Sequence, residues 1–308
     1  MPPGADVLLT LPDRPSIAVL PFANMSDDPD QEYFADGIVE DIITALSRFK
    51  SLFVIARNSS FTYKGQAVDV RQIGRELGVR YALEGSVRKA GGRLLITGQL
   101  MEAETGMHLW ADRFDGALED VFELQDQVTS RVVGELTSQM QLAEMQRAKR
   151  KPTTRLDAYD YYLRGLANLY KWTRSANEAS LPLFYKAIEL DGDFALAHAF
   201  AGHIYVLRKQ SRWVVNMAQE SAACVRLSRR AIELGPEDAL ALVLAGFNLA
   251  FIADDLDVGA DYIARGLSMN PNFALGWGFS GWVQIYLGQP EKALDHLERA
   301  ARLSPRYP

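Results

Sequence analysis

The sequence predicts an α+β domain with the element order β-α-β-α-β-β-β-α, followed by an all-α array of two-helix repeats. Between Tyr81 and Phe114, apolar and polar residues alternate at the two-residue period of strands. From Asp157 onward no strand pattern occurs, and small residues and prolines recur at distances typical of helix pairs. Two structural classes are therefore expected to follow one another in this chain.

The composition is that of a globular protein, and 308 residues are enough for about two domains. A formal net charge of −6 argues against non-specific nucleic-acid binding, so no nucleic-acid partner is expected. Cys224 is the single cysteine, which excludes an internal disulfide and predicts a small core residue. No apolar run approaches the roughly 20 residues of a membrane span, and residues 1–15 lack the pattern of a secretion signal. We therefore expect a cytoplasmic protein in which residues 1–15 form a linker.

The first domain is expected over residues 16–148, followed by a basic linker at 149–157. Short apolar runs predict buried strands, a four-residue period predicts helices, and glycine-containing turns separate the strands of an antiparallel meander. The predicted strands cover residues 16–22, 52–56, 81–88, 94–101 and 107–114. The predicted helices cover residues 30–49, 68–77 and 118–147.

Two polar segments of this domain each have a functional and a structural interpretation. Glu32, Asp36 and Glu40 form a carboxylate ladder on one helix face, which suits a divalent cation, a basic peptide or simply solvent. Residues 57–64 (RNSSFTYK) suit an anion, or a loop whose aromatic side chains pack on the sheet. Gly37 is expected to admit a closely packed neighbour, because glycine otherwise costs a helix about 1 kcal/mol relative to alanine.

The stretch 274–305 defines the repeat unit of the second part. Gly281 and Ala293 are small where two helices cross, Trp277 fills the space beside them, and Pro305 ends the second helix. These are the positions of a tetratricopeptide repeat, a unit of about 34 residues. Because one such unit cannot bury its own apolar face, further repeats are expected upstream.

Four repeats are expected, over about residues 158–193, 195–237, 239–272 and 274–306 of the span 158–308. The helix-crossing positions are occupied by Gly165, Gly202, Gly246 and Gly281. The helix-stopping positions are occupied by Pro236, Pro271 and Pro305, with Gly192 in place of proline in the first repeat. The first repeat is expanded around residues 172–177 and the second within residues 208–219.

The first domain contains the segments PSIAVLPFANMSDDPDQEYFADGIVEDIITALSR and YALEGSVRKAGGRLLITGQLMEAETGMHLWADRFDG. With its surroundings, over residues 15–135, it resembles the TolB-N-like domain that precedes tetratricopeptide repeats in many bacterial regulatory proteins. In that family this pair of domains usually forms the C-terminal part of a longer protein. The N-terminal part is a class III adenylate or guanylate cyclase or a winged-helix DNA-binding domain. The resemblance implies the regulatory half of a signalling protein, and the start LPDRPSIAVLPF resembles cyclase-linked members.

No constellation in the sequence predicts catalysis, a cofactor or a metal. Phosphate-binding patterns of the types GxxxxGK[ST] and GxGxxG are absent. No segment offers the two metal-binding aspartates on a ferredoxin-like sheet that a class III cyclase needs. The four histidines lack the spacing of a zinc site, and His198 and His203 fall on different faces of one helix. No catalytic residue, cofactor or metal ligand is assigned.

The concave surface of the repeat array is the preferred candidate for binding, because the first helix of each repeat lines it. Aromatic side chains suit peptide anchoring, since they give a large contact area for little lost side-chain entropy. The predicted peptide-binding residues are Tyr159, Tyr162, Tyr170, His203, Phe247, Phe251, Trp282 and Tyr286. The alternative is that some of them pack against adjacent helices or the first domain. No Lys/Asn pattern for clamping a terminal carboxylate is present, so an apolar or aromatic segment is the expected ligand.

The chain stops at Pro308, directly after the fourth repeat, without the polar capping helix that ends most arrays. The last helix (291–303) is therefore expected to expose Leu294, Leu297 and Leu303 at least in part, which predicts self-association.

Together these observations predict a non-catalytic regulatory or scaffold module that binds a protein or peptide in a signalling pathway. Two alternatives stay open. One is a nucleotide cyclase, as the family resemblance suggests. The other is a small-ligand sensor that acts through the α/β domain, with repeats that only mediate oligomerisation.

Overall fold

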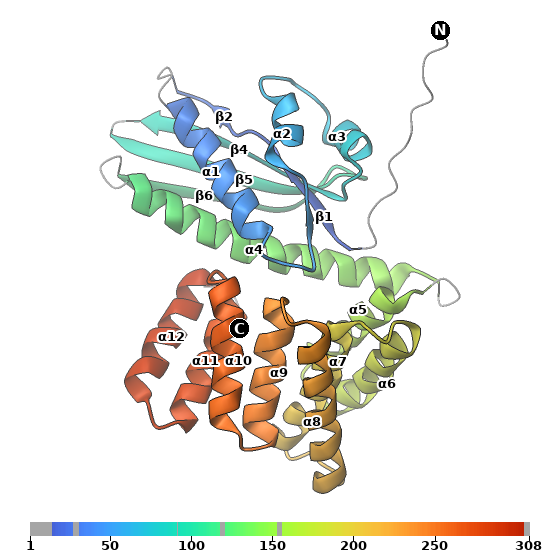
Figure 1. Ribbon diagram of the computed structural model, residues 1–308. Coiled ribbons are helices and arrows are strands. Elements are labelled where there is room, and N and C mark those ends of the chain that lie inside the picture. Colours follow the sequence, from blue (N-terminus) through green and yellow to red (C-terminus); the bar gives the residue numbers. More distant parts are fainter. Residues whose placement is uncertain (1–13, 27–30, 91, 118–120, 153–155, 305–308) are drawn as a thin grey trace. The chain divides into compact units, whose positions relative to one another are not determined.

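The structure is a computed structural model that describes residues 14–26, 31–90, 92–117, 121–152 and 156–304 (Figure 1). The chain divides into two compact units, and the division falls between Gln141 and Leu142, inside helix α4 (Val121–Arg150). The first unit combines a mixed sheet with helices and the second is helical, which confirms the predicted fold class. The residues before Arg14 and the helix-stopping Pro305 lie outside the described residues.

The sheet of the first unit has the strand order β3-β1-β4-β5-β6, with β2 beside β4, in the described residues. Its strands are β1 (Ser16–Val19), β2 (Ala23–Asn24), β3 (Phe53–Val54), β4 (Tyr81–Ala90), β5 (Arg93–Glu102) and β6 (Met107–Ala117). Strand β1 pairs in parallel with β3 and β4, whereas β4, β5 and β6 form the predicted antiparallel meander. The short strand β2 was not expected. It ends where the Asn24 side chain accepts a hydrogen bond from the Ser26 amide at 2.9 Å and so starts the predicted turn.

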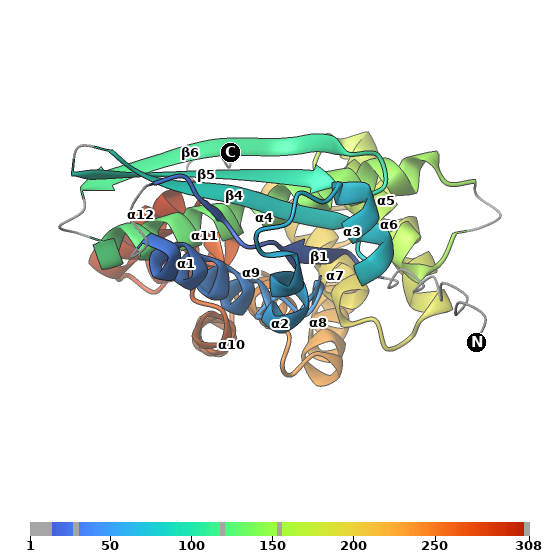
Figure 2. The same cartoon turned by 90° about the horizontal axis from the view of Figure 1, so that it is seen from above.

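The helices of this unit are α1 (Gln31–Leu46), α2 (Arg57–Ser60), α3 (Val70–Leu77) and the first part of α4, with a 3₁₀ turn at Phe61–Tyr63. Helix α3 ends at Gly78, which adopts the left-handed conformation at φ 63° as a C-terminal cap. Figures 1 and 2 show α1 and α4 along one face of the sheet. Strand alternation turns Leu100 and Phe114 towards that face, where both are buried.

The second unit pairs eight described helices in chain order, α5 with α6, α7 with α8, α9 with α10 and α11 with α12. Their bounds are α5 (Ala158–Leu169), α6 (Arg174–Leu190), α7 (Ala195–Gln210), α8 (Met217–Leu234), α9 (Ala239–Ile252), α10 (Leu256–Met269), α11 (Ala274–Tyr286) and α12 (Pro290–Leu303). Helices α6, α8 and α10 each end two residues before Gly192, Pro236 and Pro271, respectively. The array is of the tetratricopeptide type.

The helices of each pair cross at glycine. A Cβ atom added at Gly165 would lie 2.6 Å from the Phe184 ring, and one at Gly281 would lie 2.6 Å from Leu297 Cγ. Added Cβ atoms at Gly202 and Gly246 would meet neighbouring atoms at 3.0 and 2.8 Å. At Gly165, Gly246 and Gly281 a side chain would force neighbouring atoms to move, whereas at Gly202 the contact would be tight but within reach of a small shift, so the crossings favour glycine.

One of the three leucines that the sequence analysis expected to be exposed at least in part is buried, namely Leu303. Leu294 is exposed, and Leu297 is half-buried because it packs under Gly281 at the crossing of α11 and α12. The apolar surface available on α12 for self-association is therefore smaller than predicted.

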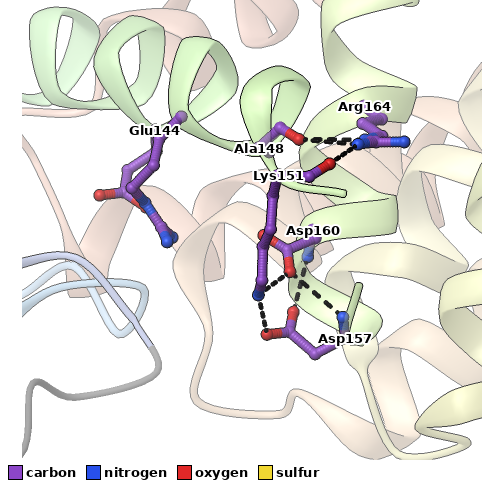
Figure 3. Close-up of polar contacts among 7 residues, drawn as sticks. Glu144, Ala148, Lys151, Asp157, Asp160 and Arg164 are labelled. Atoms are coloured by element: carbon purple, nitrogen blue, oxygen red, sulfur yellow. Dashed lines mark hydrogen bonds and ion pairs between the residues drawn. The ribbon is translucent and has the colours of Figure 1, made fainter. Parts of the chain in front are cut away.

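The last turn of α4 is bound to the start of the first repeat (Figure 3). The Arg164 guanidinium donates to the Ala148 carbonyl at 3.0 and 3.1 Å and also to the carbonyl of Lys151. The Lys151 ammonium pairs with Asp157 and Asp160, whose carboxylates also form the capping box of α5. Burial acts to raise the pKa of Asp157, but the Asp160 amide and the Lys151 ammonium outweigh it and hold that pKa below its usual value.

Candidate functional site

Rings from α7, α9 and α11 form a row that we call the aromatic strip. Its members are His203, Phe247, Phe251, Phe279, Trp282 and Tyr286. Phe247 stacks on Phe279 with ring centroids 4.2 Å apart, and Phe251 meets Tyr286 edge-on at 5.3 Å. The His203 ring lies 6.0 Å from Phe247 and 5.7 Å from Phe279. Trp282 lies three residues after Phe279 and four before Tyr286, on the same face of α11.

The strip forms because equivalent positions of successive repeats carry rings. His203, Phe247 and Trp282 occupy the same place relative to the starts of α7, α9 and α11, as do Phe251 and Tyr286 relative to α9 and α11. Stacking repeats in the same orientation brings such positions next to each other. The strip is therefore a product of repeat phase rather than of a single local motif.

The strip changes from buried to exposed along its length. His203 and Phe247 are buried, Phe251 and Phe279 are half-buried, and Trp282 and Tyr286 are 52% and 53% exposed. Gly278, one turn before Trp282, would have no atom within 4 Å of an added Cβ. The end of the strip on α11 is therefore exposed, and the space around Gly278, one turn before Trp282, is open.

His203 is a neutral member of the strip. Its Nδ1 lies 2.9 Å from Asn248 Oδ1, and the Asn248 amide nitrogen donates to the Ala199 carbonyl at 2.9 Å. Burial lowers the pKa of His203 to about 4, against the opposing effect of the hydrogen bond with Asn248. At neutral pH the imidazole is uncharged, so it contributes packing and a hydrogen bond rather than a charge for a ligand.

The three predicted tyrosines of α5 and its end lie in another environment. Tyr162 is buried among rings that we call the packed cluster, which comprises Tyr159, Tyr162, Phe184, Phe194 and Phe200. Tyr159 is half-buried and stacks on Tyr162 with centroids 5.9 Å apart, and Tyr170 is half-buried at the end of α5. Of the eight predicted residues, the structure thus brings together His203, Phe247, Phe251, Trp282 and Tyr286 in one strip.

Phe279 is a member of the strip that the sequence analysis did not select. Its position corresponds to Leu244 and Phe200 in the two preceding repeats, and both of those residues are buried. The available signal was its spacing of three residues from Trp282, which places both rings on one helix face.

The two polar segments of the first unit bind each other. The Lys64 ammonium lies 2.7 Å from Asp36 and 2.8 Å from Glu32, and Arg57 Nε lies 3.5 Å from Glu40. The Arg57 guanidinium also lies 3.8 Å above the Phe61 ring. The carboxylate ladder therefore neutralises the basic residues of 57–64, and neither segment presents the separate cation or anion site that was considered. The expected loop is instead a helical turn, α2, followed by the 3₁₀ turn.

The close approach expected at Gly37 is not found. A Cβ atom there would meet the side chain of Gln125 at 3.5 Å, which is an ordinary van der Waals distance. The described residues contain no group of three or more His, Cys, Asp or Glu side chains placed to hold a metal ion. Cys224 is buried, and burial raises the pKa of its thiol to about 12, against a hydrogen bond with Ser228, so the thiolate is not populated at neutral pH. Within the described ranges, no helix combines the length and the apolar character of a membrane span.

Comparison with known proteins finds two similarities in sequence. A family described as "HilA/YgeH-like transcriptional regulator, second domain" matches residues 13–131. The protein "Putative adenylate cyclase 3" of Rhizobium meliloti (strain 1021) is 43% identical over 223 residues, which cover 72% of this chain and 38% of that protein. The chain therefore spans well under half the length of this relative.

Comparison with solved structures finds similarities at low sequence identity. A thermophilic TPR protein, TTC0263 of Thermus thermophilus, is 12% identical, with a TM-score of 0.44, and covers 58% of this chain and 92% of its own. TolB from Acinetobacter baumannii is 17% identical, with a TM-score of 0.32, and covers 43% of this chain and 30% of its own.

Proposed function

We propose that this protein is a non-catalytic regulatory or scaffold module that binds an apolar or aromatic peptide segment at the open end of the aromatic strip. The observation that carries the proposal is the exposure of Trp282 and Tyr286 at the end of a continuous row of rings. Exposed tryptophan and tyrosine in a pre-ordered surface are the residue types that dominate binding energy at protein interfaces.

The half-buried and buried members give this surface its rigidity. Phe251 supports Tyr286 edge-on, and Phe247 and Phe279 stack behind it. At Phe251 and Tyr286 a ligand therefore meets side chains that other rings already hold by packing, which lowers the entropy lost on binding there. The proposed contact residues narrow to Phe251, Trp282 and Tyr286. Tyr162, His203 and Phe247 are buried, and Tyr159 and Tyr170 lie outside the strip.

The strip also lacks a cation for a terminal carboxylate. Lys209, the lysine near Phe251, donates to the Phe251 carbonyl at 2.7 Å and lies 3.8 Å from Asp254. Its charge is thus engaged by the array itself. An internal segment with aromatic or aliphatic side chains fits the open end of the strip better than a chain terminus.

Peptide selection tests this proposal directly. A displayed library of random peptides is selected on the intact protein and on the Trp282→Ala/Tyr286→Ala variant. The matched control is Trp172→Asn, which removes a tryptophan that is 69% exposed between α5 and α6. Asparagine suits that position, where φ is 53°.

The expected result is enrichment of aromatic or aliphatic peptides on the intact protein and the control, with loss of these peptides on the double variant. The same peptides on all three proteins, or no enrichment on the intact protein, would exclude the strip as the binding surface.

The relative's name motivates a second proposal, that the module acts in cyclic-nucleotide signalling. The chain spans 38% of that relative. We propose that the catalytic activity suggested by the relative's name belongs to the part of the relative that this chain does not cover. Incubation of the purified chain with ATP and Mg²⁺ is expected to yield no cyclic nucleotide. Production of cyclic AMP at a rate proportional to protein concentration would show that the protein is an enzyme and would contradict the proposal of a non-catalytic scaffold.

A further inference from the structure

A cavity of about 650 Å³ lies along α8, the second helix of the second repeat. Its size falls within the range of about 300 to 1,000 Å³ that is usual for ligand sites. The lining residues are Ser221, Ala222, Val225, Arg226, Arg229, Arg230, Glu233, Ile252 and Ala253. This set shares no member with the aromatic strip, so the cavity is a second candidate surface of the array.

The cavity has an apolar end and a cationic end. The apolar end contains Ala222, Val225 and Ile252, and it lies where the end of α9 approaches α8. Arg226, Arg229 and Arg230 lie towards the other end, and their spacings of three and four residues place them side by side on the helix surface.

Two of these arginines have no carboxylate to neutralise them. Arg230 lies 3.4 Å from Asp193 and 3.2 Å from Glu233. Arg226 and Arg229 form no ion pair within the part of the chain that the structure describes. Like charges one helical turn apart repel each other, so an anionic ligand would relieve a repulsion that the free array retains.

A buried histidine lies within electrostatic reach of two of these arginines. His198 is buried, and its Nδ1 has no hydrogen-bond partner among the described residues. Burial lowers the pKa of His198 and a hydrogen bond with the Gly192 carbonyl opposes this. The charges of Arg230 and Arg226 lower it further, and the charge of Asp191 raises it. The arginines thus act on groups beyond their own helix.

We propose that this cavity binds an extended acidic peptide segment, with an apolar side chain between Val225 and Ile252 and carboxylates on Arg226 and Arg229. The lining from Ser221 to Glu233 extends over about 18 Å of helix axis, at 1.5 Å per residue. An extended segment of about five or six residues covers that length. A single small anion would contact the guanidinium groups and leave the apolar end empty.

The test uses two labelled peptides and fluorescence anisotropy. The acidic probe is Leu-Leu-Asp-Glu-Asp-Glu and the neutral probe is Leu-Leu-Asn-Gln-Asn-Gln, both with an amidated end. Binding is measured to the intact chain, to Arg226→Gln/Arg229→Gln and to Arg174→Gln/Arg302→Gln. The last variant is the matched control, because it removes the same charge from exposed helix positions elsewhere in the array. Glutamine has nearly the helix propensity of arginine, so both variants are expected to fold, which circular dichroism verifies.

The acidic probe is expected to bind the intact chain at least tenfold more tightly than the neutral probe. Its affinity should fall about tenfold in the cavity variant, stay unchanged in the control and weaken with added salt. Trp282→Ala should leave the affinity for the acidic probe unchanged.

Four results would overturn the proposal. They are no binding of the acidic probe, equal losses in both double variants, loss with Trp282→Ala, and displacement of the probe by inorganic phosphate beyond the effect of sodium chloride at equal ionic strength. Loss of binding with Trp282→Ala would mean that the probe binds the aromatic strip. Displacement by phosphate would mean that the arginines bind a small oxyanion.

Discussion

The packed cluster and the aromatic strip are built from the same kinds of side chain and differ in what covers them. Phe184 in the packed cluster is 0% exposed and lies against both Tyr162 and Phe200, with ring centroids 6.1 and 5.9 Å away. In the strip, Phe247 is equally enclosed, but Tyr286 contacts a ring on one side and is exposed on the other. The first cluster is a core, whereas the second passes from core to surface.

This difference teaches that ring content and repeat position do not decide whether an aromatic residue binds a ligand. His203, Phe247 and Trp282 are equivalent in phase, yet His203 and Phe247 are buried and Trp282 is exposed. Helix α9 lies between α7 and α11, the first helices of the repeats before and after it. Among the described helices, α11 has such a first helix, α9, on one side only. The same periodic position therefore gives buried and exposed rings within one strip.

The largest effect is expected from removing a ring of the packed cluster, compared with removing one of the aromatic strip. Phe184→Ala should reduce the free energy of unfolding by about 3 to 5 kcal/mol, because it leaves a cavity among buried rings. Trp282→Ala should reduce it by less than about 1 kcal/mol, because half of the side chain is already in solvent. Urea denaturation of both variants measures this contrast, and similar losses would remove the distinction between core and binding surface.

The pH dependence of stability tests whether the His203 end of the strip is core. The folded pKa of about 4 lies below the ordinary value of 6.5, so the unfolded chain binds the proton more tightly. The stabilisation is complete above pH 6.5 and is lost as the pH falls towards 4, by up to about 3 kcal/mol. His203→Gln should show a smaller loss of stability than the intact protein between pH 7 and pH 4.5 in denaturant titrations. Parallel curves would mean that the imidazole is accessible to water.

A smaller effect is expected from the glycine under the packed cluster. Gly165→Ala places a methyl group 2.6 Å from the Phe184 ring, which must move or force α5 and α6 apart. The expected cost is about 1 to 3 kcal/mol in the free energy of unfolding. Thermal unfolding followed by circular dichroism measures it, and an unchanged melting temperature would show that the crossing is loose.

The smallest effect has the opposite sign and lies at the open end of the strip. Gly278→Ala adds a methyl group where no atom lies within 4 Å, inside helix α11. The variant should gain up to about 1 kcal/mol, because alanine has the higher helix propensity. The same thermal measurement applies. A loss of stability would mean that the space beside Trp282 is filled in solution, which would weaken the case for a ligand there.

Much of the fold could be predicted from the sequence because the relevant signals are local. The alternation from Tyr81 to Phe114 marks the meander, and the spacing of Gly192, Pro236 and Pro271 marks the helix ends. Burial depends on distant neighbours and could not be predicted in the same way. The pairing of Lys64 with Asp36 joins residues 28 positions apart, and no local pattern shows that two candidate sites will neutralise each other.

The class of each unit and the phase of the helix pairs were determined by the sequence itself, since strand period, helix period and crossing glycines act between neighbours along the chain. Which rings stay accessible was decided by the tertiary structure alone. Equivalent positions such as Phe247 and Trp282 carry the same local signal, but their exposure depends on how many helices stack on either side. For the same reason the cavity along α8 could not be predicted from the sequence, because it also needs Ile252 and Ala253 at the end of α9, which only folding brings to α8.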